Sequence, residues 1–404
     1  MISPLLGGIV GIDTGDRWLS VAGWIVAGAG GSEAIYHFSP FGTLKHLRVK
    51  LTTAPGAGES RTFEVFKGGT STGITLTISG TATTGSDLVS TYAVVAGDNF
   101  FIKQTTSATP ADSDVKWSLM FDGDTSKESP LFASSVQTLS TSLTQYLSCG
   151  GHLSGGSIPT NEDKVICVVP TNGTIKNMYV QLSGTPGGIA TRTFTLRKNK
   201  SDTTLVVTLF SLEFSKSNTF HSVSVVAGDR ISVKSTMTDS PDADRVLIGF
   251  TFVADTDGEF IILSSTENQL RTTGSRYASV STGVRLVKLS ITGVEQLAGD
   301  AMDIKKIYVH LSVAPGAGSN HAFKFFVADA ESLLNCIVAD TATACNSAST
   351  IAIAAGDKLA SRVVPTGFPV ESWAGISYLG FIAPPPSLGN PQLAMNSYRI
   401  RRNG

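Results

Sequence analysis

Two pairs of aspartates have the residue type and spacing for metal binding. Each pair stands in a polar loop just after a proline, and the pairs are Asp112 with Asp114 and Asp242 with Asp244. Carboxylates two residues apart could supply part of the roughly six to eight oxygens that Ca²⁺ takes. A third proline at the equivalent place, Pro369, is followed by Glu371 alone, and no EF-type loop accompanies any of them. We therefore interpret both pairs as solvated loop tips, and the sequence predicts no bound metal and no other cofactor.

Three further aspartates recur in the tripeptide Ala-Gly-Asp. The glycines and aspartates concerned are Gly97 with Asp98, Gly228 with Asp229, and Gly356 with Asp357. A carboxylate that recurs at a fixed place could be catalytic, but Asp next to Gly also hydrogen-bonds to its own backbone in a tight turn. We interpret all six as structural turn residues.

The six histidines are scattered, and one pair could meet in space. His310 and His321 flank Pro315 and would face each other if the two strands formed a hairpin. Where the third repeat has His321, the other two carry Arg61 and Arg192. A basic side chain at this place indicates an exposed sheet face or a subunit contact, because a metal site needs three or four ligands of defined spacing.

The four cysteines are too few and too unevenly spaced for a disulfide framework. They are Cys149, Cys167, Cys336 and Cys345. Residues 1–11 have no basic leader before their apolar stretch, so the sequence predicts no signal peptide. Without export we expect reduced thiols, although Cys336 and Cys345 could face each other across a hairpin.

No catalytic motif is present in the sequence. The chain has no nucleophile elbow, no Gly-rich loop that opens a helix and no His-Glu-x-x-His. The glycine-rich stretch 55–58 precedes a strand pattern, so no helix N-terminus would receive a phosphate there. We expect a protein that is not an enzyme.

The elements that position these residues belong to an internal repeat. Pro55, Pro186 and Pro315 each follow a similar apolar strand pattern and lie 131 and 129 residues apart. The glycine of Ala-Gly-Asp follows these prolines by 42, 42 and 41 residues. Offsets this regular indicate three copies of one module. Each proline-glycine stretch indicates a structural turn of the hairpin type between two strands.

Within each copy the apolar residues alternate with polar ones, as strands with one buried face require. Leu47, Val49 and Leu51 are an example. Turn signals recur about every 8–12 residues, the spacing expected of a sandwich or jelly roll. The predicted fold class is all-β, with three tandem β-sandwich or jelly-roll modules and N- and C-terminal arms.

Short polar stretches after each closing strand set the expected boundaries. Module 1 with an N-terminal arm covers 1–124, module 2 covers 125–255, module 3 covers 256–386, and a basic arm covers 387–404. The links are too short for flexible linkers, so we expect a semi-rigid row. Three prolines at 384–386 keep the chain extended before the arm. The arginines expected to dock this arm on a neighbouring subunit are Arg399, Arg401 and Arg402.

Charge and hydropathy exclude several classes of partner. Lys plus Arg number 31 and Asp plus Glu number 32, so the chain lacks the electrostatic footprint of a nucleic-acid binder. No run approaches the roughly 18 apolar residues of a membrane-spanning helix. Charged residues make up only 16% of the chain, which suggests large surfaces buried against other subunits. We expect neither a nucleic acid nor a membrane as partner.

The stretch from Pro55 to Asp98 resembles a β-rich repeat found in structural proteins of tailed bacteriophages and related environmental viruses. The second copy follows the same pattern at 191–199, and the third departs from it at 328–331. The resemblance covers part of each module. It implies a virion surface component, such as a capsid decoration, head-fibre or tail-associated protein, and it carries no catalytic residues over.

The resemblance implies partners and a location as well. The chain would be made in the host cytoplasm without a signal peptide and would join the virion, with other virion proteins and copies of itself as partners. Jelly-roll modules often close cyclic oligomers, so a trimer is expected. The alternative is a receptor- or glycan-binding adhesion module that presents sandwich loops to a host surface. Four tryptophans could stack on sugars: Trp18, Trp24, Trp117 and Trp373. Trp117 and Trp373 lie at similar places after Pro110 and Pro369, which fits a core strand better.

Overall fold

The computed structural model describes residues 1–25, 36–153, 157–266, 268–282 and 289–384. Within these ranges the regular elements are β-strands, apart from two single-turn 3-10 helices at Glu162–Lys164 and Ile291–Gly293. The predicted all-β class is confirmed.

The first sandwich consists of two five-stranded sheets. One sheet has the order β3-β1-β10-β5-β8, with the bounds Gly23–Ile25, Ile2–Ile12, Ser113–Gly123, Gly42–Leu51 and Thr84–Val94. The other has the order β2-β9-β6-β7 with β4 beside β9, and the bounds Arg17–Leu19, Asn99–Thr106, Gly56–Lys67, Thr70–Gly80 and Tyr36–His37. The chain passes back and forth between the sheets in the order of a jelly roll.

The second sandwich repeats this order. One of its sheets is β13-β11-β20-β15-β18, with the bounds Gly150–Leu153, Glu128–Ser135, Val246–Ala254, Gly173–Leu182 and Ser215–Val225. The other is β12-β19-β16-β17 with β14 beside β19, and it has the bounds Gln145–Leu147, Arg230–Thr238, Thr191–Lys198, Ser201–Phe210 and Cys167–Val168.

The third sandwich is built in the same way. One sheet is β21-β30-β24-β27 with β28 beside β24, and it has the bounds Glu259–Ser265, Ala374–Phe381, Met302–Leu311, Ala344–Ser347 and Ile351–Ile353. The other is β22-β29-β25-β26 with β23 beside β29, and it has the bounds Arg276–Ala278, Lys358–Thr366, Gly316–Val327, Ala330–Asp340 and Gln296–Leu297. The prediction of three tandem jelly rolls is therefore confirmed.

Alternating burial along the strands builds each core. In β5 the side chains of Leu44, Leu47, Val49 and Leu51 are buried. The three-residue step from Leu44 to Leu47 is a β-bulge at His46, where φ is 53° and the pairing register shifts. The extra residue keeps both apolar stretches of the strand on the core face, which strict alternation alone would not do.

The proline-glycine turns connect the two sheets of a sandwich, so the hairpin expectation is wrong. Pro55 lies between β5 and β6, which belong to opposite sheets, and Pro186 and Pro315 lie between the equivalent strands. Gly56 has a φ of 108° and Gly316 one of 96°, values at which a side chain would be strained. A turn signal predicts a reversal, but it carries no information on which sheet receives the next strand.

The N-terminal segment is a strand of its own sandwich and not the expected arm. β1 pairs antiparallel with β10 from Ile2 to Ile12, the place that β11 and β21 take beside β20 and β30. Gly7 allows close packing in this strand, because a Cβ there would collide with the indole ring of Trp117.

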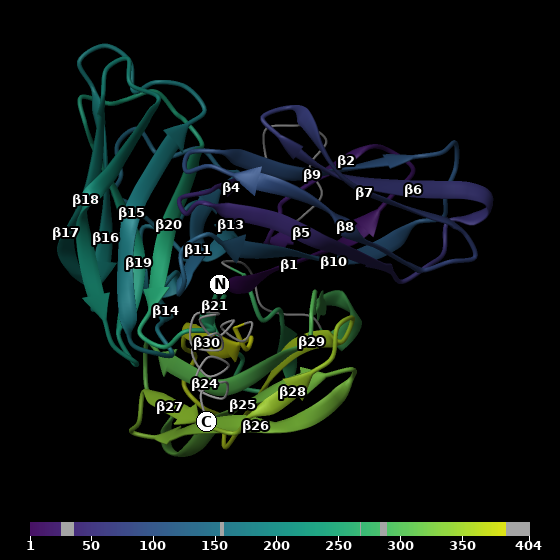
Figure 1. Cartoon of the computed structure of the whole chain (residues 1–404). Coiled ribbons are helices and arrows are strands. Elements are labelled where there is room, and N and C mark those ends of the chain that lie inside the picture. Colours follow the sequence, from purple (N-terminus) through teal and green to yellow (C-terminus); the bar gives the residue numbers. More distant parts are fainter. Residues whose placement is uncertain (26–35, 154–156, 267, 283–288, 385–404) are drawn as a thin grey trace, which may run out of the picture.

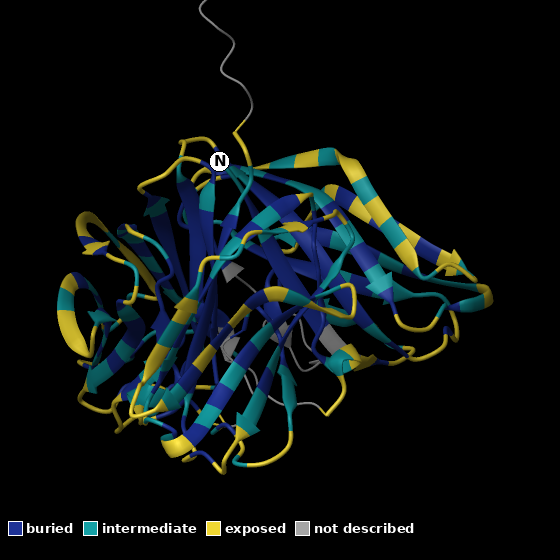
Figure 2. Ribbon diagram, turned by 90° about the horizontal axis from the view of Figure 1, so that it is seen from below, coloured by how far each residue is buried: buried dark blue, intermediate teal, exposed yellow. Residues whose placement is uncertain are grey.

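The three sandwiches form a ring around a pseudo-threefold axis, and the expected row is wrong (Figure 1). One contact occurs three times, in which a short strand of each sandwich packs on the next one. β4 lies against β20, β14 against β30, and β23 against β10. Figure 2 shows buried residues gathered in the centre of the molecule and exposed residues on the outer loops. Short links leave the modules in contact, but they do not fix the direction in which the modules pack.

Candidate functional site

The three Ala-Gly-Asp aspartates lie in tight turns and bind their own backbone. Asp98 accepts a hydrogen bond from the Val95 amide at 2.9 Å, and the equivalent bonds of Asp229 and Asp357 measure 2.9 and 2.8 Å. The adjoining glycines have φ values of 95°, 95° and 89°. These bonds use the carboxylates to close turns between strands.

The two aspartate pairs do not form metal sites in the described part of the chain. Asp114 accepts a hydrogen bond from the Gly11 amide at 2.9 Å, while Asp112 is exposed. Asp244 is buried, so the interpretation as a solvated loop tip is wrong for this residue. It accepts a hydrogen bond from Ser183 at 3.1 Å, and burial raises its pKa. Asp242 is exposed on the same loop. Among the described residues no three His, Cys, Asp or Glu side chains are grouped so that they could hold a metal ion.

Arg61 and Arg192 are fully buried, so the prediction of an exposed sheet face is wrong. Arg61 donates to the carbonyl oxygens of Asp13 and Ala111 at 2.8 and 2.7 Å. Arg192 makes the same contacts with Ser140 and Asp242 at 3.0 and 2.6 Å. Each guanidinium thus joins two loops at one end of its sandwich, and burial lowers the pKa of both arginines.

The signal for this burial was present in the sequence. Arg61 alternates with Phe63 and Val65, which places all three side chains on the same face of β6. The same period joins Arg192 to Phe194. The exposed face was expected because charged side chains usually face solvent, although the alternation places these arginines on the core face.

His310 and His321 lie in different sheets and do not form the suggested pair. His321 is fully buried at the place of the arginines, and its Nε2 lies 3.5 Å from the Val370 carbonyl oxygen. Its Nδ1 has no hydrogen-bond partner. His310 instead lies 3.5 Å from Arg230 of the second sandwich, and burial lowers its pKa to about 4.

Cys336 and Cys345 form a disulfide, with their Cα atoms 5.8 Å apart. The expectation of reduced thiols is wrong for this pair. The bond does not cross a hairpin either, because β26 and β27 are edge strands of opposite sheets. Cys149 and Cys167 are buried and free, and burial raises the pKa of the Cys167 thiol to about 11.

The three tryptophan side chains that the structure describes do not gather into one sugar-binding platform. Trp117 is fully buried in the first core. Trp18 is half-buried, with Lys103 5.6 Å from its ring centroid, and Trp373 lies beside Lys164 of the second sandwich at 5.7 Å. Of Trp24 the structure describes the backbone in β3 and not the side chain.

Polar contacts between the sandwiches were missed in the sequence and differ from one interface to the next. Between the first and second, Ser39 donates to the Asn177 carbonyl oxygen at 2.6 Å. Between the third and first, Lys116 and Glu295 form an ion pair of 3.3 Å, with 3% and 1% of their side chains exposed. These residues do not recur at fixed offsets, so the repeat gave no signal for them.

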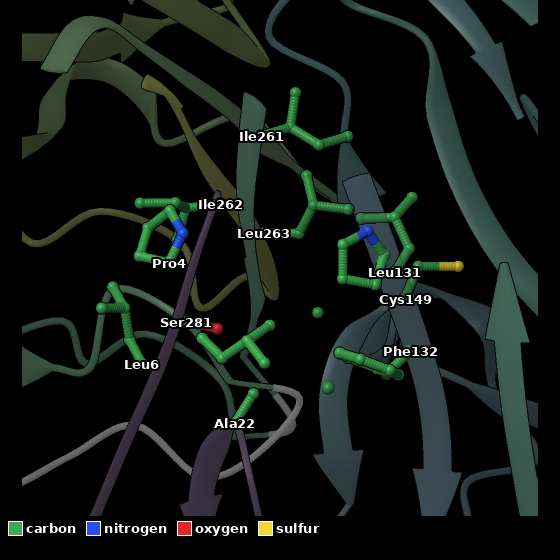
Figure 3. Close-up of a pocket in the computed structure, with 14 residues that line it drawn as sticks. Pro4, Leu6, Ala22, Leu131, Phe132, Cys149, Ile261, Ile262, Leu263 and Ser281 are labelled. Carbon is green, nitrogen blue, oxygen red and sulfur yellow. The ribbon is translucent and has the colours of Figure 1, made fainter. Parts of the chain in front are cut away.

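Two pockets lie where the three sandwiches meet. Figure 3 shows the inner one, lined by apolar side chains of the first strand of each sandwich, among them Pro4, Leu131 and Ile262. Its volume of about 40 Å³ is far below that of a small-molecule site. The second pocket has a volume of about 350 Å³, and we call it the axial pocket. Its lining consists of Met1, Ile2, Asp122, Gly123, Asp124, Ser126, Asp257, Gly258, Ile382, Ala383 and Pro384.

The second sandwich carries four exposed apolar side chains at one end, and we call Ile189, Phe210, Leu212 and Phe214 the apolar tip. The third sandwich exposes Val313, Phe368 and Val370 at the equivalent end. Ile189 and Leu212 are 83% and 80% exposed. The loops touch through a hydrogen bond from Ser211 Oγ to the Gly188 carbonyl oxygen at 2.6 Å. The first sandwich has Gly58 and Thr81 at the places of Ile189 and Leu212.

The arginines Arg399, Arg401 and Arg402 lie outside the described residues. The described part of the chain contains no helix that is long and apolar enough to span a membrane.

Comparison with known protein families and with curated proteins gives no match. Among solved structures, a chain of the Sulfolobus turreted icosahedral virus is 10% identical, with a TM-score of 0.20, over 86% of this chain and 84% of that one. A chain from a study of the triple jelly-roll fold and turret assembly in an archaeal virus is 9% identical, with a TM-score of 0.19, over 86% and 81%. Likeness at this level carries no argument about function.

Proposed function

We propose that the chain is a non-enzymatic structural protein of a virion. It would lie on the particle surface, as a capsid decoration, head-fibre or tail-associated component. It would be made in the host cytoplasm and would assemble with other virion proteins and copies of itself. The resemblance of the stretch from Pro55 to Asp98 to a repeat of tailed-bacteriophage structural proteins supports the viral assignment.

The observation that carries the structural role is the closed ring of three jelly rolls. Each sandwich packs on the next and the third packs on the first, so we infer one closed platform rather than a string of separate domains. Met1 and Pro384 line the same axial pocket, so the chain enters and leaves the ring at one end of its axis. That end is suited to attachment, and the loops of the sandwiches remain free to face outward.

Copies of the chain would associate through outer surfaces and the basic arm. The threefold contacts that would close a trimer of single jelly rolls are here made within one chain. An arm at 387–404, which follows the axial end of the ring, could reach a neighbouring subunit without disturbing the contacts between the sandwiches. Its arginines would pair with acidic groups on that subunit.

Particle composition tests the proposal directly. Mass spectrometry of purified virions from a host that produces this chain should find it at a fixed number of copies per particle. A chain without 387–404 should be incorporated at least tenfold less, while an Asp112→Asn chain should be incorporated normally. Particles that lack the chain, or a soluble chain that never cosediments with them, would overturn the proposal.

The apolar tip favours a second function, in which the ring presents loops to a receptor or glycan on a host surface. Exposed apolar side chains on loops are typical of contact sites, and the first sandwich has Gly58 and Thr81 at the places of Ile189 and Leu212. Binding of the purified chain to host cells and to a glycan array should then fall at least tenfold with Leu212→Ser. The matched change Thr81→Ser in the first sandwich should have no effect. Equal binding by both variants would remove the tip from the function.

A further inference from the structure

We propose that the C-terminal segment 385–404 of this chain docks in the axial pocket of its own ring. The proposal concerns the free chain and stands apart from incorporation into a particle. It commits to one occupant for the pocket, the chain's own C-terminal segment.

The pocket has the size and composition for a peptide segment. Its volume is about 350 Å³, and it draws on the start of the first sandwich, on both links between sandwiches and on the end of the third. Met1, Ile2 and Ile382 give it apolar walls, while Asp124 and Asp257 are exposed at it. A mixed lining of this kind suits an extended peptide with both apolar and basic side chains.

The segment begins at the pocket itself. Pro384, the last described residue, belongs to the pocket lining. Twenty further residues follow in the sequence, and in extended form they span roughly 66 Å. They can therefore turn back over the pocket without strain. Tethering gives the segment an effective concentration on the order of millimolar at the pocket, so even a weak contact would be occupied.

The charges of the pocket and the segment are complementary. Residues 385–404 contain three arginines and no Asp or Glu. At the pocket, Asp122 already pairs with Lys45 and with the amine of Met1. Asp124 and Asp257 have no cationic partner among the described residues, and Asp257 accepts only the amide of Gly258 at 2.9 Å. Two carboxylates thus remain for the arginines.

The apolar side chains of the segment also match the walls of the pocket. Leu388 and Leu393 precede the arginines, and Ile400 lies between two of them. Their burial against Met1, Ile2 and Ile382 would remove apolar surface from water on both partners. The contact would therefore depend on salt only in part.

A peptide-binding experiment tests the docking. The probe is a fluorescein-labelled peptide of residues 385–404, titrated by anisotropy against the chain truncated after Pro384. The strands of the described residues all end by Phe381, so the truncated chain keeps each of them, and its melting curve verifies that it folds. We expect saturable binding that weakens at least tenfold for Asp124→Asn with Asp257→Asn. The full-length chain should bind the peptide at least tenfold more weakly, because its own segment occupies the pocket.

The matched control changes the same charge elsewhere. Asp112→Asn with Asp239→Asn alters two exposed aspartates on loops of the first and second sandwiches, and it should leave the affinity unchanged. A peptide with its three arginines replaced by Gln should bind at least tenfold more weakly. The proposal fails if the truncated chain does not bind the peptide, if both double variants weaken binding equally, or if the full-length chain binds it as tightly. None of these outcomes depends on whether the chain joins a particle.

Discussion

Each sandwich holds one basic side chain inside the end where its loops meet, and the three differ chemically. Arg61 and Arg192 donate to carbonyl oxygens of two loops each, whereas His321 approaches a single carbonyl. A guanidinium has five donors in one plane and stays charged when buried, so it can satisfy several carbonyl groups at once. Burial of charge is rare without such partners, which is why composition alone pointed to the surface.

Arg192→Met should lower the free energy of unfolding by about 2–4 kcal/mol, because it removes the buried donor that joins the loops of Ser140 and Asp242. Arg192→Lys, which keeps the charge but has fewer donors, should cost less. Urea denaturation followed by intrinsic fluorescence measures both. Lys216→Met, an exposed change on β18, should stay within about 0.5 kcal/mol of the parent chain. An Arg192→Met chain as stable as its parent would contradict this role.

His310 should make stability fall in mild acid. Burial lowers its pKa from 6.5 to about 4, and the charged groups around it are Arg230, Asp163 and Lys200. The folded chain prefers the neutral ring, while the unfolded chain takes up a proton near pH 6.5. The contribution of His310 is therefore complete above pH 6.5 and is lost as the pH falls toward 4.

The comparison with His310→Gln isolates this effect. The urea midpoint of the parent chain should drop between pH 7 and pH 5, and the drop should be smaller in the variant. The carboxylates titrate in both chains, so their effect on the urea midpoint cancels when the two drops are subtracted. Parallel drops in the two chains would show that His310 does not carry the acid sensitivity.

The strands were the most predictable elements, and their partners the least. Alternation identified β5 because Val49 and Leu51 face the core. It did not identify the bulge at His46, since a positive φ there follows from pairing with two neighbours and not from residue type. The disulfide was equally hidden, because Cys336 and Cys345 meet only when two sheets come together.

Reduction should loosen the third sandwich more than the others. The Cys336–Cys345 bond joins the edges of its two sheets, and a loop of this length accounts for about 2–3 kcal/mol in the chain-entropy account of disulfides. Dithiothreitol should therefore lower the melting temperature of the parent chain. Cys336→Leu with Cys345→Gly copies the residues Leu76 and Gly85 of the first sandwich, and its melting should not respond to dithiothreitol. A parent chain indifferent to reduction would mean that packing alone holds this edge.

The internal repeat predicted the three sandwiches, but it did not predict that they pack into a ring. Equivalent places use unrelated chemistry at each interface. Lys116 faces Glu295 between the third and first sandwiches, whereas Gly375 lies so close to Ile166 between the second and third that a Cβ would collide with its carbonyl oxygen. A pattern that differs at each occurrence cannot be recognised from periodicity. The axial pocket was missed for the same reason, since Met1, Asp124, Asp257 and Pro384 meet only once the ring is closed.

Ring closure should depend on Glu295, because short links join the first sandwich to the second and the second to the third, but none joins the third to the first. Glu295 forms ion pairs with Lys116 at 3.3 Å and with Lys358 at 2.8 Å, and burial raises its pKa. Glu295→Ala would leave the ammonium of Lys116 buried without its partner, which should cost about 3–5 kcal/mol. Lys116→Met with Glu295→Ala should cost less than the sum of the two single changes. A double-mutant cycle on urea unfolding measures this coupling, and additive costs would show that apolar packing rather than the ion pair closes the ring.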